Sequence, residues 1–166
     1  WDKDDDIVYL AKAWKKSNAQ PYVAWEAVKS WAKGVPTAWP ADGLQHEKGT
    51  GNEQKKSYKD AGFLMLDTHA TWPGGGNSVE QGLVEIYRAM DEGKFKIFSN
   101  LSDFFDEKMN YHREENGKIV KVQDDILDAV RYAWMMRRKA IQFGFINTPV
   151  REPKVIMGRS AARRRR

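Results

Sequence analysis

Apolar residues recur along this chain with two spacings, which predict short strands alternating with helices. Residues 7–15, IVYLAKAWK, are rich in β-branched and aromatic side chains and partly alternate, which is typical of a strand. Residues 21–34 begin with a proline, end with a glycine and place apolar side chains at helical spacing, so a helix is expected there. Residues 35–43, VPTAWPADG, then predict a short apolar strand that ends at Asp42.

The rest of the chain continues this alternation. Polar residues fill the segment 44–57, which is expected to be a mobile loop. Further strands are predicted at 63–66 and 94–98, and helices at 79–91, 100–113 and 124–142. Ser78 is the expected N-cap of the first of these helices, and the pair Asn116-Gly117 predicts a hairpin within 111–122. Strands that alternate with helices indicate an α/β fold.

The composition is that of a globular domain and excludes several classes of protein. Hydrophobic residues make up 41% of the 166 positions and aromatic residues 12%, which is ample for a core. The chain has no cysteine, so disulfides and thiolate metal sites are excluded, and a reducing cytoplasm is a compatible setting. No apolar run is long enough to span a membrane, and the acidic start WDKDDD is unlike a signal peptide.

The positive net charge comes from the C-terminal end. The segment GRSAARRRR contains five arginines, and setting them aside leaves 23 basic residues against 23 acidic ones. We therefore expect one domain over 1–143 and a flexible basic tail over 144–166. The run Arg163, Arg164, Arg165 and Arg166 would attract nucleic-acid phosphates or an acidic protein surface, or would serve only solubility. Composition leaves both interpretations open.

Three aspartates gather at the start of the last predicted helix, in the segment VQDDILDAVRYA. The spacing of Asp124, Asp125 and Asp128 places their carboxylates on one helical face. Asp124 would cap the helix, and Asp125 would interact favourably with the helix dipole. Asp128 lies one turn further in, so it requires another explanation. Either it binds a cation, or it is a structural aspartate paired with Arg131 or Tyr132.

Asp42 is a second candidate ligand, because it ends a predicted strand directly before Gly43. Ligand sites of α/β folds gather at the C-terminal ends of strands. Carboxylates in a chain without cysteine, and with histidines that share no ligand spacing, favour a hard cation such as Mg²⁺ or Mn²⁺. The alternative is that PADG is an ordinary turn.

The order of these features, and above all the segments DDILDAVRYA and PADG, resembles the nuclease domain of bacteriophage large terminases. The resemblance covers residues 1–142 and is strongest for headful-packaging, short-tailed phages. It implies a ribonuclease H-like fold, in which a mixed central sheet is flanked by helices. It also implies that the family's first acidic strand lies before Trp1 and is missing from this chain, which would leave the site incomplete.

The resemblance implies a metal-dependent DNA endonuclease that hydrolyses phosphodiesters with two Mg²⁺ or Mn²⁺ ions, largely without sequence specificity. Asp42 and Asp128 would be catalytic acids, and Asp125 would be an additional metal ligand. Two alternatives of different kinds remain. In the first, the chain is a non-catalytic module that docks on the portal protein or on DNA. In the second, it is another ribonuclease H-like nuclease, of the resolvase or integrase type.

The partners that the resemblance implies are double-stranded DNA, the portal protein, the terminase small subunit and an ATPase domain of the same parent chain. The expected location is the host-cell cytoplasm, at the portal vertex of the procapsid, without a membrane. Cleavage would occur at packaging initiation and when the head is full. Arg163 to Arg166 would contact DNA or the portal.

Overall fold

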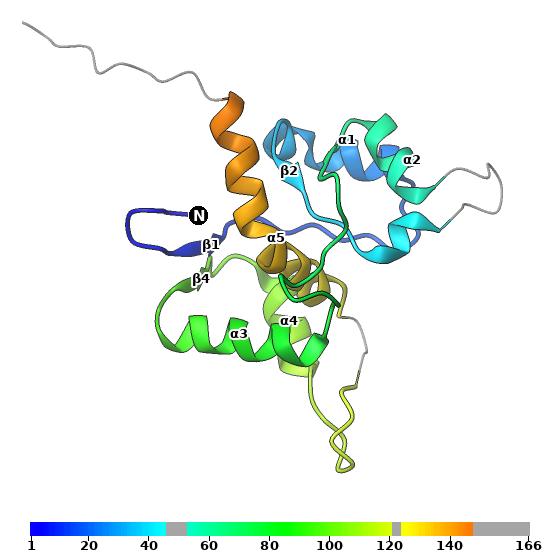
Figure 1. Cartoon of the computed structure of the whole chain (residues 1–166). Coiled ribbons are helices and arrows are strands. Elements are labelled where there is room, and N and C mark those ends of the chain that lie inside the picture. The colour runs from blue at the N-terminus through cyan, green and yellow to red at the C-terminus, as the bar shows by residue number, and fades with distance from the viewer. Residues whose placement is uncertain (46–52, 121–123, 148–166) are drawn as a thin grey trace, which may run out of the picture.

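The structure is a computed structural model that describes residues 1–45, 53–120 and 124–147 (Figure 1). Helices and short strands alternate along the chain. In order, the elements are β1 (Val8–Leu10), α1 (Pro21–Ala32), β2 (Pro36–Thr37), the 3₁₀ helix η1 (Ala41–Leu44), α2 (Gln54–Ala61), β3 (Leu64–Met65), α3 (Val79–Asp91), β4 (Phe95–Ile97), α4 (Ser102–Asn110) and α5 (Asp125–Asn147).

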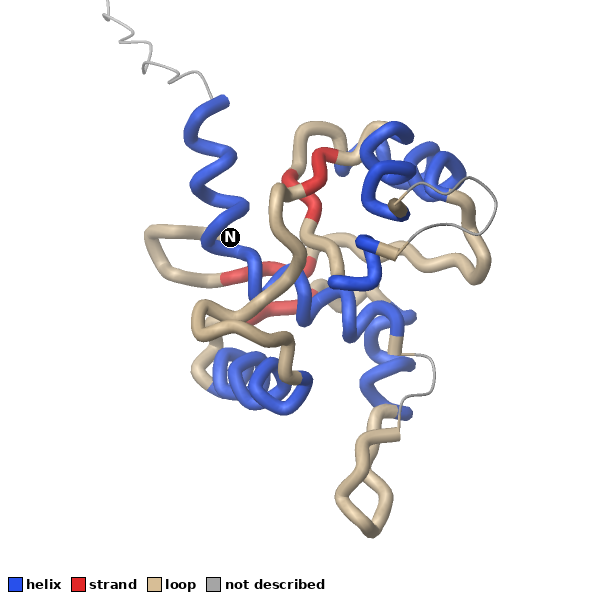
Figure 2. The backbone as a smooth tube through the Cα atoms, turned by 45° about the vertical axis from the view of Figure 1, so that its right-hand side comes forward, coloured by secondary structure: helices blue, strands red, loops and turns tan. Residues whose placement is uncertain are grey.

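The strands form two parallel pairs, drawn in red in Figure 2. In one pair β1 lies beside β4, with Val8 opposite Phe95, and in the other β2 lies beside β3, with Pro36 opposite Leu64. Parallel neighbours joined through helices agree with the predicted α/β class. The described residues show these two separate parallel pairs in place of the single mixed central sheet that the resemblance implies, and antiparallel pairing there is limited to isolated bridges.

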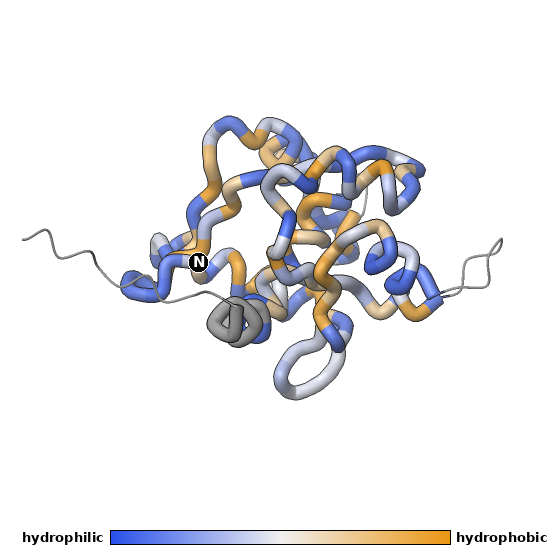
Figure 3. Tube along the Cα trace, turned by 90° about the horizontal axis from the view of Figure 1, so that it is seen from above, coloured by the Kyte–Doolittle hydropathy of each residue, from blue (hydrophilic) through white to orange (hydrophobic). Residues whose placement is uncertain are grey.

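Helix α5 lies at the centre of the molecule and packs against α3, α4 and β2 (Figure 1). Ile126, Val130 and Trp134 recur every fourth residue and are all buried, so one face of α5 points into the core. The core cluster consists of Trp39, Leu66, Ala70, Trp72, Ile86, Ala89, Phe95, Phe104, Ile126, Val130, Trp134, Met135 and Met136. Hydrophobic segments accordingly lie toward the middle of the molecule in Figure 3, and the N-terminal turn is hydrophilic.

Several predicted elements are confirmed. Helix α1 begins at Pro21, and α3 spans the predicted residues 79–91. The Ser78 hydroxyl accepts the backbone N–H of Gln81 at 3.3 Å, which is the expected N-cap.

Among the described segments, no helix is both long and apolar enough to cross a membrane.

Several predicted boundaries were wrong, and among them the strand expected over 7–15 covers only Val8–Leu10. The strand expected over 35–43 is reduced to Pro36–Thr37, since Pro40 has no N–H to donate and instead precedes the 3₁₀ helix that contains Asp42. The loop expected over 44–57 ends early, because α2 begins at Gln54 and packs against α1. Helix α5 continues to Asn147, beyond the predicted end at 142.

Helix α3 approaches α5 closely at Gly82. A Cβ added at Gly82 would lie 2.7 Å from Cγ and Cδ of Arg131, whose side chain is buried. We therefore expect Gly82→Ala to lower the free energy of unfolding by about 1–3 kcal/mol, as overpacking does, despite the better helix propensity of alanine. Urea denaturation followed by circular dichroism would measure this. Gly74→Ala is the control, because its Cβ would meet no atom within 4 Å, and equal stability of the two variants would contradict the packing argument.

Candidate functional site

The acidic residues at the start of α5 lie in one helical turn. The carbonyl of Asp124 accepts the N–H of Asp128 at 2.8 Å, so these two residues are one turn apart on the same side of the helix. Asp125 is exposed, and the side chain of Asp128 retains 28% of its accessible surface. The turn therefore presents the carboxylates of Asp125 and Asp128 at the protein surface, whereas one carboxylate oxygen of Asp124 is buried.

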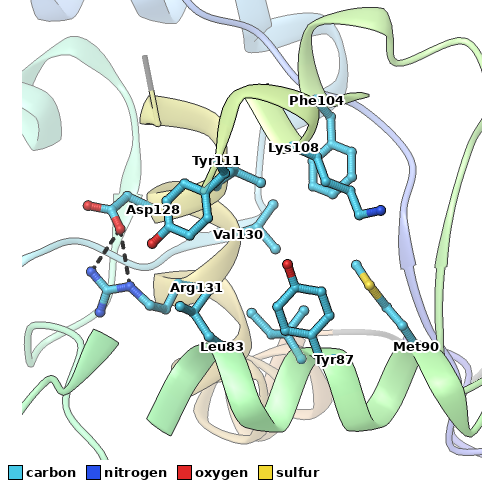
Figure 4. A pocket seen from close by; sticks show the side chains of 11 residues that line it. Leu83, Tyr87, Met90, Phe104, Lys108, Tyr111, Asp128, Val130 and Arg131 are labelled. Carbon is cyan, nitrogen blue, oxygen red and sulfur yellow. Dashed lines mark hydrogen bonds and ion pairs between the residues drawn. The ribbon is translucent and has the colours of Figure 1, made fainter. Parts of the chain in front are cut away.

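Asp128 pairs with Arg131 in the same helix. Its Oδ1 accepts hydrogen bonds from Nε at 3.1 Å and from Nη2 at 3.0 Å (Figure 4). The Nη1 of Arg131 donates to the carbonyl of Asn77 at 3.0 Å, and the guanidinium lies over the ring of Tyr132. The pairing with Arg131 that the sequence offered as the structural alternative to cation binding is thus present. It is compatible with cation binding as well, because a carboxylate offers about four lone-pair positions.

A buried glutamate of α4 caps the start of α5. The Oε2 atom of Glu107 accepts the backbone N–H of Ile126 at 2.8 Å and that of Leu127 at 3.1 Å. These amides belong to the first helical turn, whose N–H groups have no partner within the helix. The negative charge also lies at the positive end of the helix dipole. Sequence reasoning had assigned capping to Asp124 and missed Glu107, which the structure places on these amides.

Lys15 neutralises Glu107 from the segment between β1 and α1. Its Nζ lies 2.8 Å from Oε1 of Glu107, and this hydrogen bond is the main reason why the pKa of Lys15 is raised above its ordinary value of 10.5. Because the pKa of Lys15 is raised in the folded state, the stability contributed by its protonation is fully present below its unfolded-state pKa. That contribution is lost as the pH rises through the folded-state pKa.

A small pocket lies between α3, α4 and α5 beside the pair of Asp128 and Arg131 (Figure 4). It encloses about 40 Å³, room for about three water molecules and too little for a nucleotide. The Tyr111 hydroxyl lies on the side of the pocket where Asp128 and Arg131 meet. A substrate as large as DNA would therefore contact these residues from outside the pocket.

Tyr111 reports the charge at this site. Burial raises its pKa above the ordinary value of 10.0, and the charges of Asp128 and Asp124 raise it further. In a spectrophotometric titration, the phenolate signal that is lost in Tyr111→Phe should therefore appear above pH 10. Asp128→Asn should move that signal toward lower pH. Tyr22→Phe, at an exposed tyrosine, is the control for assigning the signal, and a Tyr111 signal that appears at or below pH 10 would contradict the placement.

Asp42 is exposed on η1, which follows the buried Trp39. The indole of Trp39 donates to the carbonyl of Leu66 at 2.7 Å and is part of the same core cluster as α5. A Cβ at Gly43 would lie 2.6 Å from this ring, so glycine permits the close approach of the turn. Since β2 packs against α5, the segment that leads to Asp42 is anchored on the helix that carries Asp128.

The donor set suits a hard divalent cation, although it is not a closed cage. Within 1–45, 53–120 and 124–147, no three acidic or histidine side chains are grouped closely enough to hold an ion. Mg²⁺ is commonly bound by one or two carboxylates together with water and substrate phosphates. Asp125 and Asp128 meet that requirement on one helical turn, while Asp42 lies on a separate element. Arg163, Arg164, Arg165 and Arg166 lie outside the described residues.

Comparison with known proteins identifies relatives over nearly the whole chain. Residues 1–137 match the family described as the terminase RNaseH-like domain. The chain is 56% identical to the terminase large subunit of Salmonella phage P22 over 154 residues, which is 93% of this chain and 30% of that protein. It is 59% identical to the terminase large subunit of Enterobacteria phage LP7 over 137 residues, 82% of this chain and 29% of that protein. The chain thus spans less than a third of the length of these curated relatives.

A solved structure has the same fold. The nuclease domain of the P22 large terminase matches with a TM-score of 0.79 and 57% identity, over 89% of this chain and 76% of that one. The ribonuclease H-like fold that the sequence predicted is therefore confirmed.

Proposed function

Since the chain belongs to the terminase RNaseH-like domain family, we propose that it is a metal-dependent DNA endonuclease domain of a phage genome-packaging motor. The observation that carries this proposal is the acidic first turn of α5. This turn presents Asp125 and Asp128 at the surface. The buried side chains of Glu107 and Arg131 hydrogen-bond to it. A turn of this kind, in a chain so similar to a terminase nuclease domain, favours catalysis over a purely structural role.

We propose Asp42, Asp125 and Asp128 as the residues that would hold Mg²⁺ or Mn²⁺, and Asp42 and Asp128 as the essential acids. Bound divalent ions supply Lewis-acid stabilisation of the phosphate and an activated water. The protein contributes the placement of its carboxylates. Arg131 restrains Asp128 through two hydrogen bonds to Oδ1, and the Trp39–Gly43 contact fixes the turn of Asp42. Such a site engages phosphates and reads no bases, so cleavage would be largely independent of sequence.

We propose for this domain the partners that the resemblance to large terminases implies. The domain would act on double-stranded concatemeric DNA, cutting at packaging initiation and headful termination, together with an ATPase domain of the same parent chain. It would meet the portal protein and the terminase small subunit at the procapsid vertex in the host cytoplasm. We propose that Arg163 to Arg166 contact DNA or the portal. If they contact DNA phosphates, the affinity for DNA should fall steeply as the salt concentration rises.

A plasmid-nicking assay tests the proposed function. Supercoiled DNA would be incubated with Mn²⁺ or Mg²⁺, using this chain and a longer version that matches the full length of the solved P22 nuclease domain, of which this chain covers 76%. We expect metal-dependent nicking that EDTA abolishes, stronger in the extended form. If neither form cleaves DNA with either metal, the endonuclease proposal fails and a docking module becomes the better description.

A further inference from the structure

Glu107 is a buried acidic side chain that the proposed chemistry does not use, and it is among the most buried charged groups of the described residues. It retains 2% of its accessible surface, on a helix whose Phe104 lies in the core with 1% exposed. Burying a carboxylate is costly unless its charge is paired and its oxygens are hydrogen-bonded. Both conditions are met, by Lys15 at Oε1 and by two backbone amides at Oε2.

The two amides belong to Ile126 and Leu127, which lie between Asp125 and Asp128 in the chain. Glu107 therefore accepts hydrogen bonds from the backbone that separates the two proposed metal ligands. Helix ends fray when their first amides have no acceptor. A metal site requires its ligands to be held within about 0.5 Å of the binding geometry. A first turn attached to α4 would satisfy that requirement, and a frayed turn would not.

We propose that Glu107 is a positioning residue of the metal site, which holds Asp125 and Asp128 in their ion-binding arrangement by accepting hydrogen bonds from the amides between them. The proposal rests on the proposed function, because it presupposes that these aspartates bind the cation. Glu107 itself is buried beneath the helix start, so it would not contact an ion held by these aspartates. Lys15 pairs with the buried carboxylate and holds it in place.

Two double variants separate the effect of the hydrogen-bond acceptor at position 107 from the effect of its negative charge. Glu107→Gln with Lys15→Met, and Glu107→Ala with Lys15→Met, have the same formal charge and leave no unpaired lysine. Only the first keeps an acceptor oxygen for the two amides. By isothermal titration with Mn²⁺ on folded protein, we expect the alanine pair to bind about tenfold more weakly than the glutamine pair. The loss is of the size seen when supporting partners of metal ligands are removed.

Further variants distinguish the possible failures. Val28→Ala, in the buried face of α1, lowers stability away from the site and should leave Mn²⁺ affinity unchanged, so a general loss of stability cannot imitate the effect. Equal affinities of the two double variants, with binding lost in Asp128→Asn, would overturn the positioning role alone. Absence of Mn²⁺ binding by the unmodified chain, or unchanged binding in Asp128→Asn, would overturn the proposed function and this inference together.

If the alanine pair does not fold, Glu107→Asp takes its place. This variant keeps the charge but is one methylene shorter, so its carboxylate cannot reach both amides while paired with Lys15. We expect about tenfold weaker Mn²⁺ binding than in the unmodified chain. An unchanged dissociation constant in a folded Glu107→Asp protein would contradict the proposal.

Discussion

Replacing Asp128 by asparagine is expected to reduce metal-dependent DNA nicking by at least about 100-fold. Loss of a residue that only supports a metal ligand costs about 10–100-fold, and loss of a ligand should cost more. Asparagine keeps the shape of the side chain and can still accept a hydrogen bond from Arg131, so the variant should fold. The measurement is the initial nicking rate of supercoiled plasmid with Mn²⁺, in whichever form of the chain cleaves DNA.

Asp91→Asn is the matched control for this experiment. Asp91 is an exposed aspartate at the end of α3, and its replacement changes the net charge equally. Its nicking rate should equal that of the unmodified protein. If Asp128→Asn also keeps its full rate, then Asp128 serves only as the structural partner of Arg131. The proposed catalytic assignment would then be wrong.

Glu107→Ala is expected to lower the free energy of unfolding by about 3–5 kcal/mol. The substitution leaves two amides of the first turn of α5 without their acceptor, and it removes the buried member of an ion pair whose lysine side chain is 33% exposed. Since a domain of this size is stable by only about 5–15 kcal/mol, this one contact would account for a large share. Urea denaturation, with the unfolding free energy extrapolated to water, would measure the loss.

Glu26→Ala is the control for burial. Glu26 also pairs with a lysine, Lys29 at 2.6 Å, but both side chains are about half exposed. Surface pairs of this kind contribute about 0–1 kcal/mol. A comparable loss in the two variants would show that burial and capping at Glu107 add nothing beyond an ordinary surface ion pair.

The helices were predictable from the sequence where local signals agree with packing. Ser78 caps α3 as expected, and α1 begins at its proline. The chain around Asp42 was not predictable in detail, because Pro40 and the Trp39–Gly43 contact bend it into a 3₁₀ turn. Helix α2 was not predicted, because its residues are mostly polar and its stability comes from packing against α1.

The candidate site shows the same division between local and long-range information. The spacing of Asp125 and Asp128, and the pairing of Asp128 with Arg131, depend on the helical repeat and could be read from the sequence. Glu107 caps residues nearly twenty positions later in the chain, so no local sequence pattern predicts its role. The available signal was its placement three residues after Phe104, on a face that proves to be buried.

The central claim is that divalent ions bind at the start of α5, and paramagnetic broadening tests it most directly. Mn²⁺ would be titrated into isotope-labelled protein while backbone amide signals are followed by NMR. The account predicts that the signals of Asp125 to Asp128 broaden first, together with that of Asp42. Broadening that begins at the acidic turn of Asp2 to Asp6, with α5 unaffected, would contradict it.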